Sequence, residues 1–419
     1  MKVTLYSTAA LVMTIGVSAY AQEMTGMPTP LATLISEAQL NNTQLSAADH
    51  AWKAATHVAQ QMTTLPDPQF TIQSYSVGSP KPFAGFSNSD FAYFGFGASQ
   101  DIPYAGKLHL KGEVANRDAD MQQAQSDLLR TSITEQVKLL YLRLAYLEAT
   151  LSILGRNDAV LKPLIETGLS RYSLGQGSQA DVLKAQIEHT KILREVTVHH
   201  QEMGQLQASL KQLLHRSQTS ADVIPEPLSL TPLRYTAEEL QALVAAHNPS
   251  VAVNSADIEK QNAQLKSTQR ESKPDFNVGY MFQQTGAGYR DYYMLTLNMR
   301  LPRRKRVEAG VAQAAESLER SKQELDSQVQ QQLAEVQKQY IAVTDTAELL
   351  KEYQDGLLPQ SQAAFRAEQA TYQSGKQAFA PVLSSLLDAL TFEHDSQQAL
   401  LDHETALARL ETLTGAQLR

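Results

Sequence analysis

The sequence predicts a mainly α-helical protein with a small transmembrane β part, built from two copies of one unit that contains two strands and a long helical hairpin. Three observations predict this fold class. The stretch RYSLGQGSQADVLKAQ, residues 171–186, returns in weaker form as TYQSGKQAFAPVLSSL, residues 371–386. Long segments carry apolar residues at heptad spacing. Short segments with period-two alternation, less clean over residues 91–99, precede them.

The duplication extends beyond the two glycine-centred turns. A shift of 200 residues, which takes Tyr172 to Tyr372, also pairs residues in the helical segments on both sides. Because the matches share one register, they indicate two copies of one supersecondary unit. The other matched pairs are Glu135 and Glu335, Lys138 and Lys338, Gly175 and Gly375, Val182 and Val382, Leu183 and Leu383, Leu210 and Leu410, and Leu213 and Leu413.

Residues 1–21 are expected to be a signal peptide. The stretch MKVTLYSTAALVMTIGVSAYA places Lys2 before an apolar run and ends in the small-x-small pattern Ala19-Tyr20-Ala21 of a signal-peptidase site. A lone membrane-anchor helix is the alternative, but the run contains polar threonines and is shorter than the roughly 20 apolar residues that a bilayer requires. The mature chain is therefore expected to start near Gln22.

The rest of the chain divides into two repeats. No other segment is apolar over a comparable length, so any membrane insertion of the mature chain is expected to use β-strands. The chain contains no cysteine, which excludes disulfides, thiolate metal sites and a lipid-modified N-terminal cysteine. The first repeat is expected over residues 22–216, a proline-rich linker over 217–235, and the second repeat over 236–419.

Two half-buried strands are expected near the start of each repeat. They are predicted at about residues 69–77 and 91–99 in the first repeat, and at about 275–283 and 292–301 in the second. Their length approaches the roughly 9 to 11 residues that a transmembrane β-strand requires. The side chains predicted to face lipid are Phe276, Val278, Tyr280, Phe282, Leu295, Leu297 and Met299.

The helices that follow the strands are expected to be unusually long. Residues 133–154 and 329–350 carry apolar side chains at alternating steps of four and three, which is a coiled-coil seam that must face another helix. Glycine and proline are expected to break or kink these helices before they reach the turns. These residues are Gly155 and Pro163 in the first repeat, and Gly356 and Pro359 in the second. Returning helices are expected over residues 178–215 and 378–415.

The composition points away from an enzyme and from a nucleic-acid partner. The formal net charge is −8 and charges of both signs are interspersed, so no basic patch is apparent. No Ser/His/Asp set, glycine-rich phosphate loop or metal-ligand spacing is present. His199 and His200, beside Glu195 and Glu202, are expected to lie on a solvated helix face rather than to bind a metal. We therefore expect no catalytic residue, metal or cofactor.

The strands imply assembly with other copies. Four strands cannot close a barrel alone, an open sheet edge is not tolerated in lipid, and small membrane barrels start at about eight strands. Insertion into a membrane therefore requires an oligomer. The alternative is two soluble hairpins packed on the helices, which would leave the apolar strand faces exposed.

The order of segments resembles that of the outer-membrane efflux proteins of the TolC family, over essentially the whole mature chain. It runs from a signal peptide through a helix at about residues 31–64, a strand pair, a long helix, a Tyr-x-x-Gly turn and a returning helix, and then repeats. The most specific pieces are the duplicated turn and the strand-to-helix junctions QDIPYAGKL, residues 100–108, and RLPRRKR, residues 300–306. The resemblance implies a homotrimer, with one outer-membrane β-barrel of twelve strands continued by a periplasmic α-helical coiled-coil tunnel.

The resemblance also implies a function. It places the protein in the outer membrane of a Gram-negative bacterium as the passive exit duct of a tripartite efflux pump, in contact with outer-membrane lipid. Its partners would be a periplasmic adaptor (membrane fusion) protein and an inner-membrane efflux transporter. The junction QDIPYAGKL further resembles the branch that exports heavy-metal cations, so metal cations or small toxic compounds are the implied substrates. The lipidated N-terminal cysteine of many relatives in that branch is missing here. A non-conducting periplasmic coiled-coil structural or adaptor protein is the alternative function.

The two turns at residues 174–177 and 374–377 have two interpretations. Glycine commonly ends a helix because it accepts a positive φ, so a turn without any partner would suffice to explain it. In the family, the corresponding turns meet the hairpin tips of the adaptor. The residues that would dock the adaptor are Leu174, Gly175, Gln176, Ser374, Gly375 and Lys376.

A periplasmic gate is implied just beyond the turns. In the family, an acidic residue six positions after the tip glycine takes part in the constriction, and Asp181 matches it. Asp181 also fits a capping box with Ser178. The second repeat has Pro381 and Ser384 where relatives often carry acidic residues, so Asp388 would have to replace them. The candidate gate residues are Asp181, Lys184, Ser384 and Asp388.

The basic run Arg303–Arg306 follows the last predicted strand. Cations are poorly placed near a helix N-terminus. A solvated helix start, contact with anionic lipid headgroups and contact with a neighbouring protomer are the three interpretations of this run.

Overall fold

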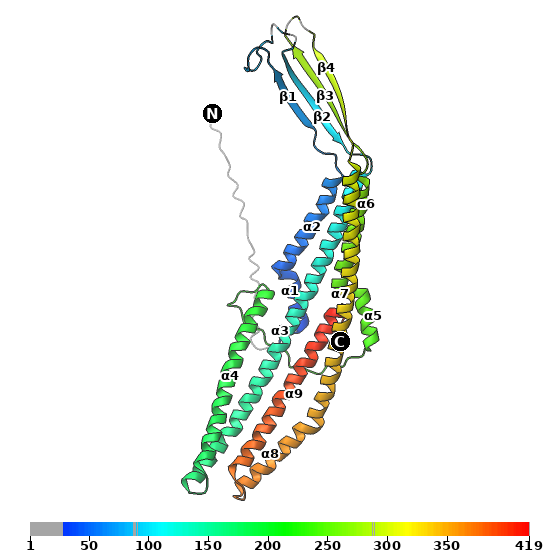
Figure 1. Ribbon diagram of the computed structural model, residues 1–419. Coiled ribbons are helices and arrows are strands. Elements are labelled where there is room, and N and C mark those ends of the chain that lie inside the picture. The colour runs from blue at the N-terminus through cyan, green and yellow to red at the C-terminus, as the bar shows by residue number, and fades with distance from the viewer. Residues whose placement is uncertain (1–27, 87–88, 90, 287, 289, 419) are drawn as a thin grey trace, which may run out of the picture.

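The computed structural model describes residues 28–86, 89, 91–286, 288 and 290–418, so the predicted signal peptide lies outside the described residues. Figure 1 shows a long molecule with a sheet at one end and two helical hairpins at the other. The predicted mainly helical class with a small antiparallel sheet is confirmed. The elements are α1 (Leu31–Asn41), α2 (Thr43–Thr63), β1 (Gln69–Tyr75), β2 (Tyr93–Ile102), α3 (Lys107–Ser173), α4 (Gln179–Leu213), α5 (Ala237–His247), α6 (Pro249–Arg270), β3 (Asp275–Thr285), β4 (Tyr292–Arg300), α7 (Arg304–Glu352), a π-helix η1 (Tyr353–Leu357), α8 (Leu358–Gln373) and α9 (Phe379–Thr414).

Both halves of the chain begin with the same asparagine-centred corner. Asn42 separates α1 from α2 and caps α2 by accepting the N–H of Gln44 at 2.9 Å, so the helix expected over residues 31–64 is in fact interrupted. Asn248 separates α5 from α6 in the same way. Each asparagine amide also donates to the last turn of the returning helix, at 3.0 Å to the carbonyl of Leu213 and 2.8 Å to that of Leu413. The two corners therefore anchor equivalent helices with equivalent bonds.

The expected break in the first long helix is absent. Helix α3 continues for 67 residues through Gly155 and Pro163. A proline inside a helix costs about 3 kcal/mol because it removes one hydrogen bond and crowds the preceding turn. Leu161 and Leu164 flank the proline and are 0% and 4% exposed, which indicates that packing on both sides keeps the helix continuous.

The second long helix is not broken at Gly356 and Pro359 either, but it contains a π-turn there. The backbone stays helical at Leu357 and Leu358, so α7, η1 and α8 form one continuous helix, with Gly356 inside η1 and Pro359 just after it. A π-turn accommodates one extra residue. The repeats show this residue, because Pro103 and Pro302 before the long helices are 199 positions apart, whereas Tyr172 and Tyr372 after them are 200 positions apart.

One antiparallel sheet contains all four strands in the order β1-β2-β3-β4. The central pair, β2 with β3, joins the first half of the chain to the second and places Ile102 opposite Phe276 and Phe96 opposite Phe282. Strands β1 and β4 are the two edges. The sheet therefore ends on both sides in strands that pair with only one neighbour in the described chain.

The heptad seams lie in the helical core. In α3, the seam residues Ile133, Val137 and Leu144 are at most 1% exposed, and in α7 the buried seam residues include Val336 and Val343. Helix α3 packs against α2, α4, α6 and α9, whereas α7 packs against α6 and α9. The helix of the first half thus has neighbours from both halves, and that of the second half has neighbours from its own half.

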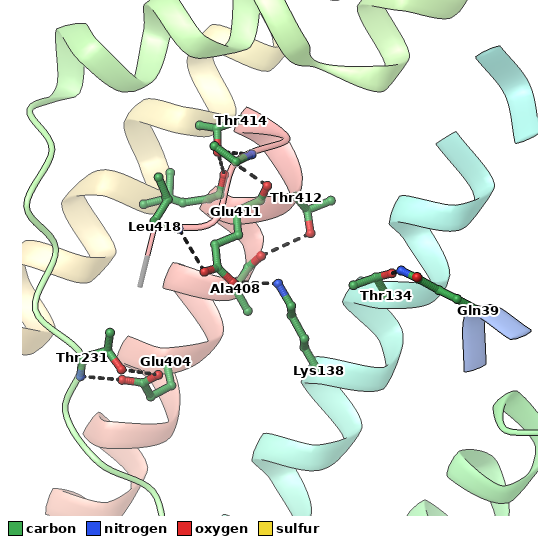
Figure 2. A network of polar contacts seen from close by, with 12 residues as sticks. Gln39, Thr134, Lys138, Thr231, Glu404, Ala408, Glu411, Thr412, Thr414 and Leu418 are labelled. Atoms are coloured by element: carbon green, nitrogen blue, oxygen red, sulfur yellow. Dashed lines mark hydrogen bonds and ion pairs between the residues drawn. The ribbon is translucent and has the colours of Figure 1, made fainter. Parts of the chain in front are cut away.

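A buried polar network ties the C-terminal helix to the rest of the molecule (Figure 2). Glu411, 5% exposed, accepts Lys138 of α3 at 2.7 Å and the N–H of Leu418 at 3.1 Å. About two turns earlier, Glu404 accepts hydrogen bonds from both the N–H and the hydroxyl of Thr231 in the linker, at 2.8 and 3.2 Å. The carboxylates of α9 thus hold α3, the linker and the chain end together.

We predict that Lys138→Met lowers the free energy of unfolding by about 3 kcal/mol, because it removes the cation that faces a buried carboxylate. Lys338→Met is a control with the same substitution in the second repeat. The spacing of 199 residues before η1 makes Gln337, not Lys338, the structural equivalent of Lys138. The pairings of Lys138 with Lys338 and of Glu135 with Glu335 at 200 residues are therefore one residue out of register. Lys338 is 72% exposed and pairs with Glu335 within one helix, so its loss should cost less than about 1 kcal/mol. Thermal unfolding followed by circular dichroism measures both, and equal effects of the two substitutions would contradict the prediction.

Candidate functional site: hairpin tips, sheet faces and junction

Both hairpin tips are Schellman turns. At the end of α3, Gly175 has φ 72°, its N–H donates to the carbonyl of Tyr172 at 3.0 Å, and the N–H of Gln176 donates to that of Arg171 at 2.8 Å. At the end of α8, Gly375 has φ 78° and the corresponding bonds are 3.0 and 3.2 Å. This geometry accounts for the two glycines. All six residues predicted to dock an adaptor are exposed, and Leu174 is 71% exposed.

Arg171 connects the two tips. Its guanidinium donates to the carbonyl of Tyr372 at 2.7 Å and lies 4.2 Å from the centre of the Tyr372 ring. Tyr372 is 3% exposed and also contacts Phe379 edge to face. Burial raises the pKa of the Tyr372 phenol, and the positive charge of Arg171 only partly offsets this effect. The phenol therefore remains neutral, and the contact combines a charged hydrogen bond with a cation–π interaction.

The candidate gate residues are not gathered in one place within the chain. Asp181 lies in the first turn of α4 and lines a small cavity with Arg171 and Tyr372. Lys184, Ser384 and Asp388 are exposed, and no hydrogen bond or ion pair in the described part of the chain joins them to Asp181, although Lys184 lies one turn further along α4. Any ring formed by these four residues would therefore require other copies of the chain.

The predicted capping box at the start of α4 is only half formed. The Ser178 hydroxyl accepts the N–H of Ala180 at 3.1 Å, but in the described residues the returning bond from Asp181 is missing. A complete capping box is found at the start of α5, between Thr236 and Glu239. Asp181 instead is one of the residues that line the cavity between the tips.

The side chains predicted to face lipid share one face of the sheet. The register places Met299 opposite Phe276, Leu297 opposite Val278 and Leu295 opposite Tyr280. Leu295 and Leu297 are 76% and 69% exposed. On β1, Phe70 and Ile72 continue this face through Ala98 and Phe96 of β2. An exposed apolar surface that spans four strands indicates that another apolar phase or surface covers it, and contact with lipid remains a prediction.

The opposite face of the sheet is polar. Asn277 donates to Asp101 at 2.9 Å and Asn298 donates to Asn277 at 3.4 Å, which makes a ladder across β2, β3 and β4. Gly97 also lies on this side, and a Cβ there would be 2.6 Å from the carbonyl of Tyr280. One face of the sheet is thus suited to an apolar environment and the other to water.

A buried cation marks the junction between sheet and helices. Lys107, the first residue of α3, is 3% exposed, and its ammonium lies 3.1 Å from Glu271 and 2.9 Å from Asp275. Asp275 also accepts the N–H of Tyr104 at 3.1 Å. The acidic residues come from the second half of the chain and the cation from the first, so this cluster fixes the two halves at the base of the sheet.

Sequence reasoning missed both the tip contact and the junction cluster. Arg171 stands in the stretch that defines the duplication, but its partner is about 200 residues away. Lys107 could have been noticed because it follows a Tyr-Ala-Gly turn at the junction, at the position of Arg306 in the second repeat. In neither case does the local sequence identify the partner.

The solvated helix face expected for the histidine pair is found for His200 but not for His199. His200 is exposed and bonds to the carbonyl of Val196 at 2.9 Å, whereas the His199 side chain is only 16% exposed and its Nδ1 lies 3.9 Å from Glu202. Within the described residues, no group of three or more metal-binding side chains occurs. No described helix is both long enough and apolar enough to cross a membrane.

Comparisons with known proteins agree with this geometry. The model of the outer membrane efflux protein family matches residues 34–215 and again residues 240–416. Three solved structures have the same fold. CusC has a TM-score of 0.79 and 15% identity over 93% of both chains, and its structures concern transmembrane channel formation. The outer membrane protein VceC from Vibrio cholerae has a TM-score of 0.77 and 17% identity over 93% of this chain and 97% of its own.

The third structure is the open state of the MtrE outer membrane channel of Neisseria gonorrhoeae, with a TM-score of 0.76 and 18% identity over 93% of this chain and 89% of that one. No match was found among curated proteins. The two consecutive matches of the family model cover most of the chain, one on each half. The chain therefore belongs to the outer membrane efflux protein family.

Proposed function

We propose that the protein is the exit duct of a tripartite efflux pump. It lies in the outer membrane of a Gram-negative bacterium and extends into the periplasm. Three copies assemble, their sheets close one barrel of twelve strands, and their helices continue the barrel as a tunnel. The duct conducts passively, and energy comes from an inner-membrane efflux transporter through a periplasmic adaptor.

The observation that carries this proposal is the sheet with one apolar face, one polar face and two edges. Each edge strand presents a row of backbone N–H and C=O groups, and such groups cannot remain unpaired in lipid. Pairing β4 of one copy with β1 of the next satisfies both rows. Since known small membrane barrels have about eight strands or more, a closed barrel requires several copies.

The length of the helices supports the periplasmic part of the proposal. At 1.5 Å per residue, the 67 residues of α3 extend about 100 Å from the sheet. The exposed tips at the far end are the docking surface for the adaptor in this proposal. Asp181, Lys184, Ser384 and Asp388 line the gate near the tips, where only two of the four residues are acidic. Metal cations or small toxic compounds are the proposed substrates, on the resemblance of the junction QDIPYAGKL.

Assembly and conduction test the proposal directly. Protein purified in detergent should have the mass of a trimer and should form discrete conducting pores in planar lipid bilayers. Recovery of the chain only as a soluble periplasmic monomer would instead support the non-conducting coiled-coil alternative.

The strand faces give a sharper prediction. Leu297→Arg should strongly reduce insertion into the outer membrane, because an arginine facing lipid near mid-bilayer costs roughly 2–4 kcal/mol. Asn298→Arg is the matched control on the next residue, and it should insert normally because Asn298 lies on the polar face. The measurement is the amount of each variant in purified outer membranes, and equal amounts would show that the faces are assigned wrongly.

The tips give a prediction about the partner. Gln176→Glu combined with Lys376→Glu should abolish pump-dependent resistance while the amount of trimer in the outer membrane stays normal, since both side chains are exposed and neither fixes the turn. Gln176→Ala with Lys376→Ala is the milder control and should change little. Normal resistance in the charge variant would exclude the tips as the adaptor surface.

A further inference from the structure

The second strand and the long helix of each half present equivalent surfaces, but only those of the first half are covered within the described chain. The second strand and long helix of the first half, β2 and α3, contact the first strand and second helix of the second half, β3 and α6. The equivalent elements, β4 and α7, have no such partners in the described chain. Their partners would be β1 and α2, which lie at the opposite edge (Figure 1). In a ring of copies, these two edges meet.

Equivalent residues of the two strand hairpins are separated by constant spacings in the sequence, one for the second strand and one for the first. Ile102 and Leu301 occupy the same position before the Pro residue that ends the second strand, a spacing of 199 residues. A Pro-Asp dipeptide stands at or just before the start of the first strand of each half, as Pro66-Asp67 and as Pro274-Asp275, a spacing of 208 residues. The observed strand register agrees with both spacings. Extending the β1–β2 pairing by two residues brings Asp67 opposite Asp101, and Asp275 lies opposite Arg300, which is the residue equivalent to Asp101 at a spacing of 199.

These spacings identify the residues that are equivalent to the junction cluster at the outer edges of the sheet. Lys107, buried against Glu271 and Asp275, corresponds to Arg306 in the second repeat, and Asp275 corresponds to Asp67. Arg306 and Asp67 are both exposed, and the described residues offer neither of them an ion pair. Arg304, in contrast, already pairs with Glu308 at 2.6 Å within its own helix.

We infer that Arg306 of one copy binds Asp67 of the neighbouring copy, in the interprotomer counterpart of the Lys107–Asp275 contact. The inference rests on the proposed trimer and adds the residues that hold it together at the base of the barrel. Asp67 of the neighbouring copy also accepts the backbone N–H of Arg303, as Asp275 accepts that of Tyr104 within one chain. Within the basic run, Arg306 is thus a protomer contact rather than a lipid-binding or solvated side chain.

The same spacings fix the register of the closing strand pair. The pairing of Ala98 with Tyr280 in the central strands becomes a pairing of Leu297 with Ile72 of the neighbouring copy. Likewise, Met299 comes to lie opposite Phe70 of the neighbouring copy. Both pairs place apolar side chains on the face that is already apolar. The register derived from the Pro-Asp spacing therefore keeps apolar side chains on the apolar face of the sheet and polar side chains on the polar face, whereas a shift by one residue would mix them.

A charge-reversal cycle tests the ion pair. We expect Arg306→Glu and Asp67→Arg each to raise the dissociation rate of the heated trimer by roughly tenfold, which corresponds to about 1.4 kcal/mol. The double reversal should restore the rate to near the parent value, because the effects of contacting charges are coupled. Arg304→Glu is the matched control with the same charge change, and its trimer should dissociate at nearly the parent rate. The fraction of trimer is read by native mass spectrometry or by electrophoresis of unboiled samples.

The other outcomes are distinct. Failure of the double reversal to restore the trimer, or no effect of either single reversal, would overturn the ion pair while leaving the trimeric channel intact. Equal weakening by Arg306→Glu and Arg304→Glu that is relieved by vesicles of anionic phospholipid would assign the run to lipid headgroups and also overturn it. A parent protein that is monomeric would contradict the proposed function itself.

Disulfide trapping tests the register without charge changes. The chain has no cysteine, so introduced pairs have no background. Ile72→Cys with Leu297→Cys should give chains linked to one another on mild oxidation, seen as dimer and trimer bands without reductant. Ile72→Cys with Asn298→Cys places the thiols on opposite faces and should give few linked chains. Linking of the control pair and not of the test pair would overturn the register.

Discussion

The edges of the four-stranded sheet are the constraint on which the rest of the molecule depends. Backbone hydrogen bonds join β2 to β3 and thereby the first half of the chain to the second, whereas β1 and β4 each keep one unpaired row in the described chain. A sheet with an apolar face cannot bring such edges into lipid. In the proposed assembly, further copies pair with these edges in the same order as the two halves pair within one chain.

The contact between the hairpin tips and the contact at the base of the sheet differ in whether both repeats carry the residues for them. At the tips, Arg171 binds the carbonyl and ring of Tyr372, but the equivalent of Arg171 in the second repeat is Thr371, which has no cation to offer Tyr172. Tyr372 is 3% exposed while Tyr172 is 45% exposed. At the base of the sheet, both repeats retain a cation and an aspartate. The hairpins within one chain are therefore joined by chemistry that the outer sides of the hairpins lack, whereas the junction can be equivalent all around the assembly.

The fold could be predicted from sequence wherever a pattern repeats over many residues. The heptad seams, the strand alternation and the duplicated turn each sum weak preferences over a long window. Single-residue signals were less reliable. Pro163 did not break α3, because buried leucines on both sides outweigh one lost hydrogen bond, whereas Asn42 did end a helix, because its side chain caps the next helix and binds the carbonyl of Leu213. Tertiary packing decided both cases.

The candidate site likewise contains features that the local sequence predicts and features that depend on distant residues. The exposed tips and the shared face of the apolar strand residues follow from local turn geometry and from strand alternation, and the structure places both as the sequence suggests. Lys107 looks like an ordinary surface lysine at a helix start, since its partners Glu271 and Asp275 are more than 160 residues away. Sequence alone could not supply that contact. The contact seen in one repeat nevertheless explains the other repeat. Arg306 and Asp67 are exposed and occupy the positions equivalent to Lys107 and Asp275, as expected of two residues whose partners lie on neighbouring copies in the proposed assembly.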